Sequence, residues 1–482
     1  MARGGEAVKQ VRRLVLPPAI FYHKHNLGCD VLEMKRATWI LVLMCSLLFS
    51  ISCGDDDDDD DDDNDAVDDD DEDDTVDDDD TTPDDDDDDD TTPDDDDDDD
   101  DDTEVTYDDD PLLTGWLVET VDVIQYADRA THTSIAVDSD AQPHIVYWEN
   151  VLTVADSHLY EAIRADDQWT TQAILTDRRP DGYPSLEIDP DDIAYLSFFD
   201  RLPITEDGKT GQGVLAFAVK SAGVWSAQVA AAHPDQESVG YFNSLAVDGD
   251  GFAHIGYRAK AEDEYGFDAL GYTDNESGAW EYLLLSVNDE PENVTARHIS
   301  LAVDGTGKTH LCQGSGSLGM GGIGYFTNAG GDWTSGGIPG GYDKSNCSLA
   351  LDNDDEPYIA FQYAEVDWGE DDDVYALGFA QRDGCSWAWV TIDPAIWRVG
   401  SDAYLAIDDQ GKAHLAICGF DVDGNPVLKY ITNASGEWAR GVVDPQYESG
   451  YGASIALDGD GYVHVSYIDQ TNNAIKYATN RP

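Results

Sequence analysis

The sequence predicts an all-β fold made from a repeated four-stranded unit, and three observations predict it. A short hairpin pattern, clearest as SIALDGDGYVHVSY over residues 454–467, occurs seven times after residue 110. The copies are spaced by roughly 53 residues. Each copy is followed by a third apolar strand and then by a Trp that begins a fourth strand. Four antiparallel strands in such a repeat are typical of a propeller blade.

The first two strands of each unit are predicted from a shared turn. An Asp begins each turn, and the turn residues include glycines that can adopt positive φ. The turn aspartates are Asp138, Asp189, Asp248, Asp304, Asp352, Asp408 and Asp458. Four residues earlier stand Ser134, Ser185, Ser244, Ser300, Ser348, Tyr404 and Ser454, and six residues later stand His144, Tyr195, His254, His310, Tyr358, His414 and His464. These matches predict seven hairpins in one common register.

The third and fourth strands follow each hairpin. Segments such as 428–431 and 270–273 predict the third strand, and the fourth begins at Trp169, Trp225, Trp280, Trp333, Trp387 and Trp438. The last repeat ends before its Trp strand, whereas residues 116–122 resemble residues 438–444. We therefore expect an N-terminal strand to complete the final blade and close a seven-bladed β-propeller, which removes exposed sheet edges. A β-solenoid is the alternative, and an immunoglobulin-like array is excluded by the repeat spacing.

Composition divides the chain into residues 1–53, 54–110 and 111–482. The formal net charge is −77, and residues 54–110 contain 41 acidic residues with no Lys or Arg. The 111–482 segment is itself acidic, with 59 Asp and Glu against 19 Lys and Arg. Such a surface repels phosphate backbones, so no nucleic-acid partner is expected.

An export signal is predicted near the N-terminus. Met34-Lys35-Arg36 precedes an apolar run over residues 37–52, which has the order of a secretory signal, so Met34 is the expected true start. The run is short for a membrane-spanning helix. Residues 47–54, LLFSISCG, resemble the lipobox of bacterial lipoproteins, although Ser50 stands where that family usually has Leu. The resemblance implies a lipid on Cys53, and the alternatives are an ordinary signal peptide or a retained anchor helix.

Residues 54–110 are predicted to form a disordered, extended tether, because a nearly pure Asp tract repels itself and buries no apolar surface. A low-affinity calcium sponge is the alternative. Acidic residues soon after a lipobox cysteine resemble surface-export signals in some bacterial lipoproteins. The expected location is the outer membrane, with the propeller exposed as a monomer.

The repeated residues are interpreted as framework. One His in each blade places the imidazoles apart around a ring, so each is expected to serve its own blade, and the Trp residues are expected to fill the wedges between blades. No cofactor is predicted, and calcium is left open. Asp421 and Asp423 form the best single calcium candidate, while the other Asp-Gly turns are interpreted as hairpin turns.

Four cysteines lie in the last segment. In an exported domain they can form two disulfides, with three connectivities. Sequence separation favours Cys312 with Cys347 and Cys385 with Cys418, each pair joining neighbouring blades.

A ligand is expected on the face that carries the irregular loops between second and third strands and between blades. Arginine and aromatic side chains gather there and suit a neutral or carboxylated sugar, or a protein partner. The candidate ligand-binding residues are Arg178, Arg179, Arg201, Arg258, Arg297, Trp368, Trp397, Arg398 and Tyr451. The alternative is that charged residues simply favour loops.

The repeat Ser-x-Ala-x-Asp-x-x-Gly-x-x-His resembles exported bacterial propellers of the sialidase-like and fucose-lectin-like type. Turns such as 433–438 lack the Asp of the sialidase Asp-box and are one residue shorter before Trp438. The resemblance implies a propeller that binds carbohydrate, and no catalytic residue is assigned. The first hypothesis is therefore a cell-surface binding or adhesion module. The alternatives are a sialidase-like glycoside hydrolase or lyase, which needs a pair of carboxylates, and an envelope scaffold protein.

Overall fold

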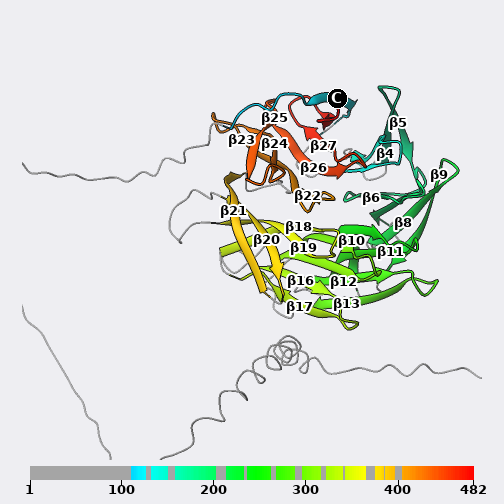
Figure 1. Ribbon diagram of the computed structural model, residues 1–482. Coiled ribbons are helices and arrows are strands. Elements are labelled where there is room, and N and C mark those ends of the chain that lie inside the picture. The colour runs from blue at the N-terminus through cyan, green and yellow to red at the C-terminus, as the bar shows by residue number, and fades with distance from the viewer. Residues whose placement is uncertain are drawn as a thin grey trace, which may run out of the picture. The chain divides into compact units, whose positions relative to one another are not determined.

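A computed structural model describes residues 110–125, 127, 132–149, 158–201, 213–232, 236–261, 268–287, 296–315, 322–339, 342–364, 375–384, 386–396 and 404–482. They belong to one compact part of the chain, Val105–Pro482, and every regular element assigned in them is a β-strand (Figure 1). Within these ranges, no helix has the length and hydropathy needed to cross a bilayer. The predicted leader, residues 1–53 with Cys53, and the predicted acidic tether, residues 54–110, lie outside the described residues except for Asp110.

Four antiparallel strands form each repeated unit, in the predicted order. The first unit contains β2 (Thr133–Val137), β3 (Pro143–Glu149), β4 (His158–Ala165) and β5 (Gln168–Ile174), which pair in that sequence. Units are named below by their first strand. The other strands are β6 (Ser185–Ile188), β7 (Ala194–Arg201), β8 (Gly213–Ser221), β9 (Val224–Ala231), β10 (Gln236–Val247), β11 (Ala253–Ala261), β12 (Asp268–Asp274), β13 (Glu281–Val287), β14 (Ala296–Val303), β15 (Thr309–Ser315), β16 (Ile323–Thr327), β17 (Thr334–Gly337), β18 (Tyr342–Leu351), β19 (Pro357–Ala364), β20 (Tyr375–Asp383), β21 (Ser386–Ile396), β22 (Tyr404–Ile407), β23 (Ala413–Phe420), β24 (Pro426–Thr432), β25 (Ala439–Asp444), β26 (Ser449–Leu457), β27 (Val463–Asp469) and β28 (Ala474–Thr479), with β1 at Leu117–Val123.

Some neighbouring units merge, which the repeat pattern did not predict. There are three four-stranded and two eight-stranded sheets among the described strands. The β6 and β10 units are joined only by the pair Ser238 and Gly213, and the β18 and β22 units only by Ile396 and Gly419. Neighbouring units therefore approach closely enough at these points for one backbone pair to bridge two otherwise separate sheets.

The fourth strand of the last unit comes from the other end of the sequence. β1 pairs antiparallel with β28, with Leu117 opposite Thr479 and Val118 opposite Ala478. The sheet order is β1-β28-β27-β26. The resemblance between residues 116–122 and 438–444 correctly indicated this strand, because both segments occupy the outer edge of a unit.

The turn of each hairpin is held by its first Asp. In the β26 unit, Asp458 Oδ1 accepts hydrogen bonds from the backbone N–H groups of Asp460 and Tyr462, at 3.0 and 2.9 Å. Gly461 has φ +82°, a conformation that glycine adopts without steric cost. In three copies a non-glycine residue, Ala141, Asp192 or Asp355, takes the same conformation, so the turn and not the glycine is the constant feature.

The residue six positions after that Asp is part of the same framework. In the β22 unit, His414 Nε2 lies 3.2 Å from Asp408 Oδ2, and Nδ1 lies 2.5 Å from the hydroxyl of Tyr430. Where the position holds Tyr195 or Tyr358, the phenol donates directly to the turn Asp, at 2.9 or 3.0 Å. Either His or Tyr can therefore occupy this position, because the side chain of each reaches the Asp carboxylate. These contacts fit the interpretation that the residues are part of the framework.

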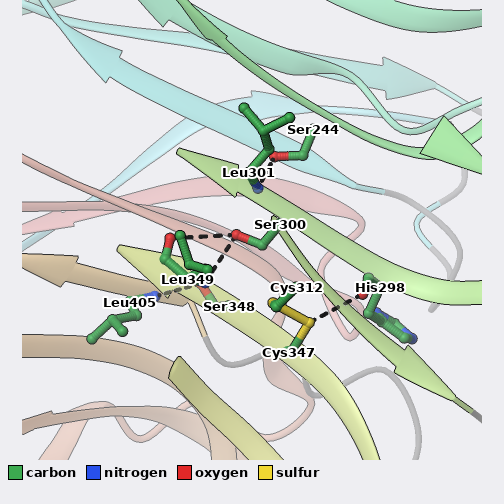
Figure 2. Close-up of a disulfide and its surroundings, with 9 residues drawn as sticks. All are labelled: Ser244, His298, Ser300, Leu301, Cys312, Cys347, Ser348, Leu349 and Leu405. Carbon is green, nitrogen blue, oxygen red and sulfur yellow. Dashed lines mark hydrogen bonds between the residues drawn. A yellow bond between two sulfur atoms is a disulfide. The ribbon is translucent and has the colours of Figure 1, made fainter. Parts of the chain in front are cut away.

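The repeated serines connect neighbouring units. Ser244 Oγ accepts the backbone N–H of Leu301 at 3.0 Å, and Ser300 and Ser348 make the same bond to Leu349 and Leu405 (Figure 2). The series also includes Ser134 to Leu186, Ser185 to Leu245 and Ser454 to Ile135. The last of these links strands β26 and β2, so the first and last hairpins are neighbours.

The core lies between the units. Trp333 of the β14 unit meets Tyr272 of the β10 unit edge-on, with ring centroids 4.9 Å apart. Trp169 of the β2 unit meets Tyr477 of the β26 unit in the same way, at 5.2 Å. These rings fill the wedge between two units, as predicted, and edge-to-face aromatic pairs add roughly 1 kcal/mol each beyond burial.

Candidate functional site

The inner strands surround a central cavity of about 250 Å³. All seven strands that carry the repeated Ser position contribute to its lining: β2, β6, β10, β14, β18, β22 and β26. Each of these strands begins at one end of the cavity and leads to its Asp-led turn at the other end. Because hydroxyls and backbone groups dominate this wall, the cavity is polar along its length.

Four ring side chains form a continuous arc at the end of the cavity opposite the turns. They are His132, Tyr183, Phe242 and His298, and they line a recess that adjoins the cavity. Successive ring centroids lie 4.7, 4.5 and 5.3 Å apart. Tyr404 lines the same recess. These five residues are called the mouth below.

The mouth residues are presented by strained backbone. Tyr183, Phe242 and His298 have φ of 56°, 47° and 54°, and Asn346 at the same repeat position has 45°. Bulky side chains rarely adopt this region, and each instance costs on the order of 1–3 kcal/mol. Strand pairing also shifts register beside Phe242, His298 and Asn346. Such bulges turn side chains toward a new direction and are frequent near functional sites.

Among the residues that the structure describes, Glu187 supplies the one carboxylate in the cavity lining. Glu187 stands two residues before its turn Asp, where the other repeats have Ala136, Ala246, Ala302, Ala350, Ala406 and Ala456. The surrounding protein removes water from the group, and this burial raises the pKa of Glu187 to about 7. Glu187 can therefore exchange a proton near neutral pH.

Two of the six predicted arginines, Arg178 and Arg201, pair with acidic neighbours. Arg178 Nη1 lies 3.3 Å from Asp200 Oδ2, and its Nη2 donates to the carbonyl of Ala227 at 2.8 Å. Arg201 forms an ion pair with Asp181. These two side chains therefore brace the segment before β6. The side chain of Arg179 is exposed beside them.

The remaining predicted residues divide into three groups. The guanidinium of Arg258 lies 5.8 Å from the ring centroid of Phe242, which places it against the mouth. Tyr451 is completely buried in a core cluster and so does not belong to a surface formed by loops. Trp368, Trp397 and Arg398 lie outside the described residues, as does the side chain of Arg297.

The calcium candidate forms an ordinary turn. Asp421 Oδ1 accepts the backbone N–H groups of Asp423 and Asn425 at 3.0 and 2.8 Å, and Oδ2 accepts the Asn425 amide at 3.1 Å. Both carboxylate oxygens of Asp421 are thus used within the hairpin between β23 and β24. These bonds repeat the pattern of the Asp-led turns.

A disulfide joins Cys312 on β15 to Cys347 on β18, in neighbouring units as sequence separation favoured. Cys347 Sγ lies 3.4 Å from the backbone carbonyl oxygen of His298, so the disulfide contacts the backbone of a mouth residue (Figure 2). Cys418 is buried, and its predicted partner Cys385 lies outside the described residues.

A second hollow, of about 380 Å³, opens between the β2 and β6 units at the turn end. Both carboxylates in its lining are engaged within the fold, since Asp138 lies 3.2 Å from His144 and Asp192 accepts two hydrogen bonds from Ser139. The mouth is therefore the better candidate for a ligand site than this second hollow, because it combines ring surfaces with an adjoining cavity.

Sequence reasoning missed the mouth. Its ring residues stand six positions before the turn Asp, where the repeats have His132, Tyr183, Phe242, His298, Asn346, Asp402 and Gly452. The available signal was a position that is in register with the repeat but holds six different residue types in seven copies. The serine and histidine positions were recognised because they repeat, and this position was passed over because it does not.

No protein-family model matches the sequence, and no curated protein matches it. Several solved structures show a distant likeness. A protein of unknown function from Dyadobacter fermentans is 12% identical, with a TM-score of 0.45, and covers 76% of this chain and 99% of its own. An α-L-arabinofuranosidase of Fusarium graminearum solved with arabinobiose is 11% identical, at 0.46, covering 76% and 97%. A polysaccharide lyase that acts on ulvan is 14% identical, at 0.46, covering 77% and 94%.

Proposed function

We propose that residues 111–482 form a closed seven-bladed β-propeller that binds a glycan at the mouth of its central cavity. Serine bonds join six of the seven neighbouring pairs of inner strands, including the bond from Ser454 to Ile135, and they support a closed ring. The seventh strand, β22, has Tyr404 at the serine position. The pairing of β1 with β28 supports closure by the N-terminal strand. The chain is then a binding module whose ligand site lies on the ring axis.

The arc of rings at the mouth is the observation that carries this proposal. Half-buried rings of Tyr183 and Phe242, next to a polar cavity, offer apolar faces for sugar C–H groups beside partners for sugar hydroxyls. Retaining bulky residues at positive φ costs stability, and such strained residues cluster at active sites and ligand-binding sites. Arg258 against Phe242 adds a positive charge, which suits a carboxylated sugar as well as a neutral one.

The proposed setting follows from the N-terminal residues. Cys53 is the proposed lipid-bearing residue, and the acidic segment after it would hold the propeller away from an outer membrane as a monomeric surface module. Asp110, at the end of that segment, is ion-paired with Lys429 at 2.6 Å and Arg440 at 2.8 Å. These ion pairs would fix the point at which the tether joins the propeller.

Glycan-array binding by the full chain, followed by titration of the strongest ligand, tests the proposal. Tyr183→Ala and Phe242→Ala are expected to weaken binding at least tenfold, because each removes one ring of the arc. Tyr282→Ala is the matched control, since it removes an exposed ring on the outer strand β13, 54% exposed. Equal affinity for all four proteins would contradict the site. Failure to bind any glycan would overturn the glycan proposal and favour an envelope scaffold protein.

A glycoside hydrolase or lyase is the second candidate, favoured by Glu187. A carboxyl group with a pKa of about 7 in the cavity wall can serve as a general acid or base. Fluorogenic sialosides and a uronate-containing polysaccharide would serve as substrates for the full chain. Turnover that falls at least a hundredfold in Glu187→Gln would establish the enzyme in place of the binding module. Glycan binding without turnover would exclude it for those substrates.

A further inference from the structure

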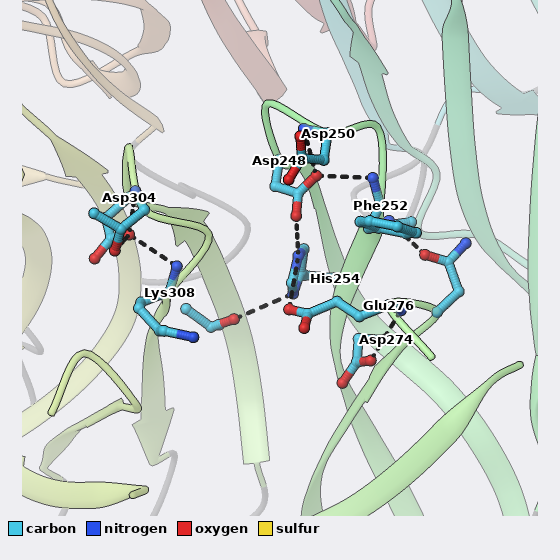
Figure 3. A network of polar contacts seen from close by, with 12 residues as sticks. Asp248, Asp250, Phe252, His254, Asp274, Glu276, Asp304 and Lys308 are labelled. Atoms are coloured by element: carbon cyan, nitrogen blue, oxygen red, sulfur yellow. Dashed lines mark hydrogen bonds and ion pairs between the residues drawn. The ribbon is translucent and has the colours of Figure 1, made fainter. Parts of the chain in front are cut away.

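Three side chains of the types that bind metal ions converge at the turn end of the β10 unit, away from the mouth. Asp248 belongs to the β10–β11 turn, His254 lies on β11, and Glu276 belongs to the β12–β13 turn (Figure 3). His254 Nε2 lies 3.4 Å from Asp248 Oδ2 and 3.8 Å from Glu276 Oε1. One atom from each residue lies within 4.8 Å of the other two. The three donors thus face a common point.

The imidazole of His254 is oriented to bind a metal ion through Nε2. His254 is fully buried, and its Nδ1 lies 2.7 Å from the hydroxyl of Tyr272. With Nδ1 as the donor in that bond, Nε2 presents its lone pair toward the two carboxylates. Ligand atoms about 2.0–2.1 Å from one tetrahedral ion lie about 3.3–3.4 Å apart, close to the separation from His254 to Asp248. Glu276, with 48% of its side chain exposed, can adjust its position.

The same position in other units shows how unusual Glu276 is. In the β26 unit it holds Arg481, whose guanidinium pairs with Asp458 beside His464. In the β14 and β22 units it holds Ala329 and Ala434. The β26 unit therefore supplies its own cation to the Asp-His pair, whereas the β10 unit adds a second carboxylate. Among the described residues, no Lys or Arg forms an ion pair with Asp248 or Glu276.

We propose that Asp248, His254 and Glu276 bind a divalent transition-metal ion of the zinc type. One imidazole and two carboxylates leave an open coordination position, and an imidazole donor disfavours calcium, which prefers oxygen ligands. The ion would occupy the place that the Arg481 guanidinium takes in the β26 unit and would fasten the two turns of the β10 unit together. This site is independent of the proposed glycan site, which lies at the other end of the inner strands.

Zinc chloride titration of the metal-free full chain, read by calorimetry and by thermal unfolding, tests the proposal. The acidic segment contributes the same background to every variant, so differences between variants report the site. Wild type is expected to show one tight event and a Tm raised by roughly 5 °C at saturation. Glu276→Ala introduces the alanine that the β22 unit has at the equivalent position, Ala434. This variant is expected to lose the tight zinc-binding event and the rise in Tm, while its metal-free Tm stays unchanged.

A gain-of-site variant sharpens the test. Ala434→Glu places the missing carboxylate beside Asp408 and His414, so it is expected to bind a second zinc ion with similar affinity. Glu276→Arg is expected to copy the arrangement around Arg481, abolishing zinc binding while retaining stability. Identical zinc titrations for wild type and Glu276→Ala, or no zinc binding beyond the acidic background, would overturn the proposal.

Discussion

The two ends of the inner strands differ in what they repeat. At the turn end, each Asp bonds its own backbone and a His or Tyr six residues later, as Asp408 and Asp189 show. At the mouth, Tyr183, Phe242 and His298 occupy one repeat position with different side chains and strained backbone. Residues that recur stabilise the repeated units, whereas we propose that residues which differ at an equivalent position recognise a ligand. The zinc proposal extends this lesson, because Glu276 is also an exception at a repeated position.

The largest effect is expected from breaking the framework at the turn end. Where the sixth residue after the turn Asp is Tyr195 or Tyr358, the ring facing it is Phe217 or Phe379, whereas His414 faces Tyr430. His414→Tyr alone should lower the free energy of unfolding by about 4 kcal/mol, because two phenols then compete for one space. Adding Tyr430→Phe should restore it to within about 1 kcal/mol of wild type.

Urea unfolding of the two variants measures this rescue. Glycan affinity is expected to stay unchanged in the double variant, because the mouth lies at the other end of the strands. A double variant as unstable as His414→Tyr would show that the pairing of ring types within the repeat has no structural basis.

An intermediate effect is expected from the disulfide behind the mouth. Replacing both Cys312 and Cys347 by Ala should lower the free energy of unfolding by about 3 kcal/mol, because a cross-link that restrains the unfolded chain is lost. Since Cys347 contacts the His298 carbonyl, glycan affinity should also fall several-fold. Loss of stability with unchanged affinity would separate the disulfide from the mouth.

The smallest effect is expected in the pH dependence of folding stability, through the protonation of Glu187. Its pKa rises from 4.5 in the unfolded chain to about 7 in the folded protein, so the folded state binds the extra proton between these values. Stability should therefore fall as pH rises from about 4.5 to 7, by on the order of 2 kcal/mol. Glu187→Ala, matching the other repeats, should flatten this part of the profile. Parallel profiles for the variant and wild type would contradict the raised pKa.

The framework could be predicted from sequence because it repeats. The turn Asp, the Ser four residues earlier and the Trp of the fourth strand recur in register, and each makes the same contact in nearly every unit where it occurs. The strand supplied by residues 117–123 was recognisable for the same reason. The single bridges between sheets, such as Ser238 with Gly213, depend on how closely two units approach and leave no pattern in the sequence.

The candidate site was predicted only in part. Arg258 was predicted from the sequence on the face with the irregular loops, and in the structure its guanidinium lies against the Phe242 ring at the mouth. Arg178 and Arg201 turned out to be paired with Asp200 and Asp181, which only the three-dimensional arrangement reveals. The mouth itself depends on positive φ at Tyr and Phe, and no propensity predicts that conformation for such residues.

A crystal structure of the full chain with its strongest array glycan tests the central claim most directly. The account predicts a sugar ring packed within about 4 Å of the Tyr183 or Phe242 ring, at the end of the cavity opposite the turns. A glycan bound instead at the Asp-led turns, or in the wedges between units, would contradict the claim that recognition belongs to the residues that do not repeat.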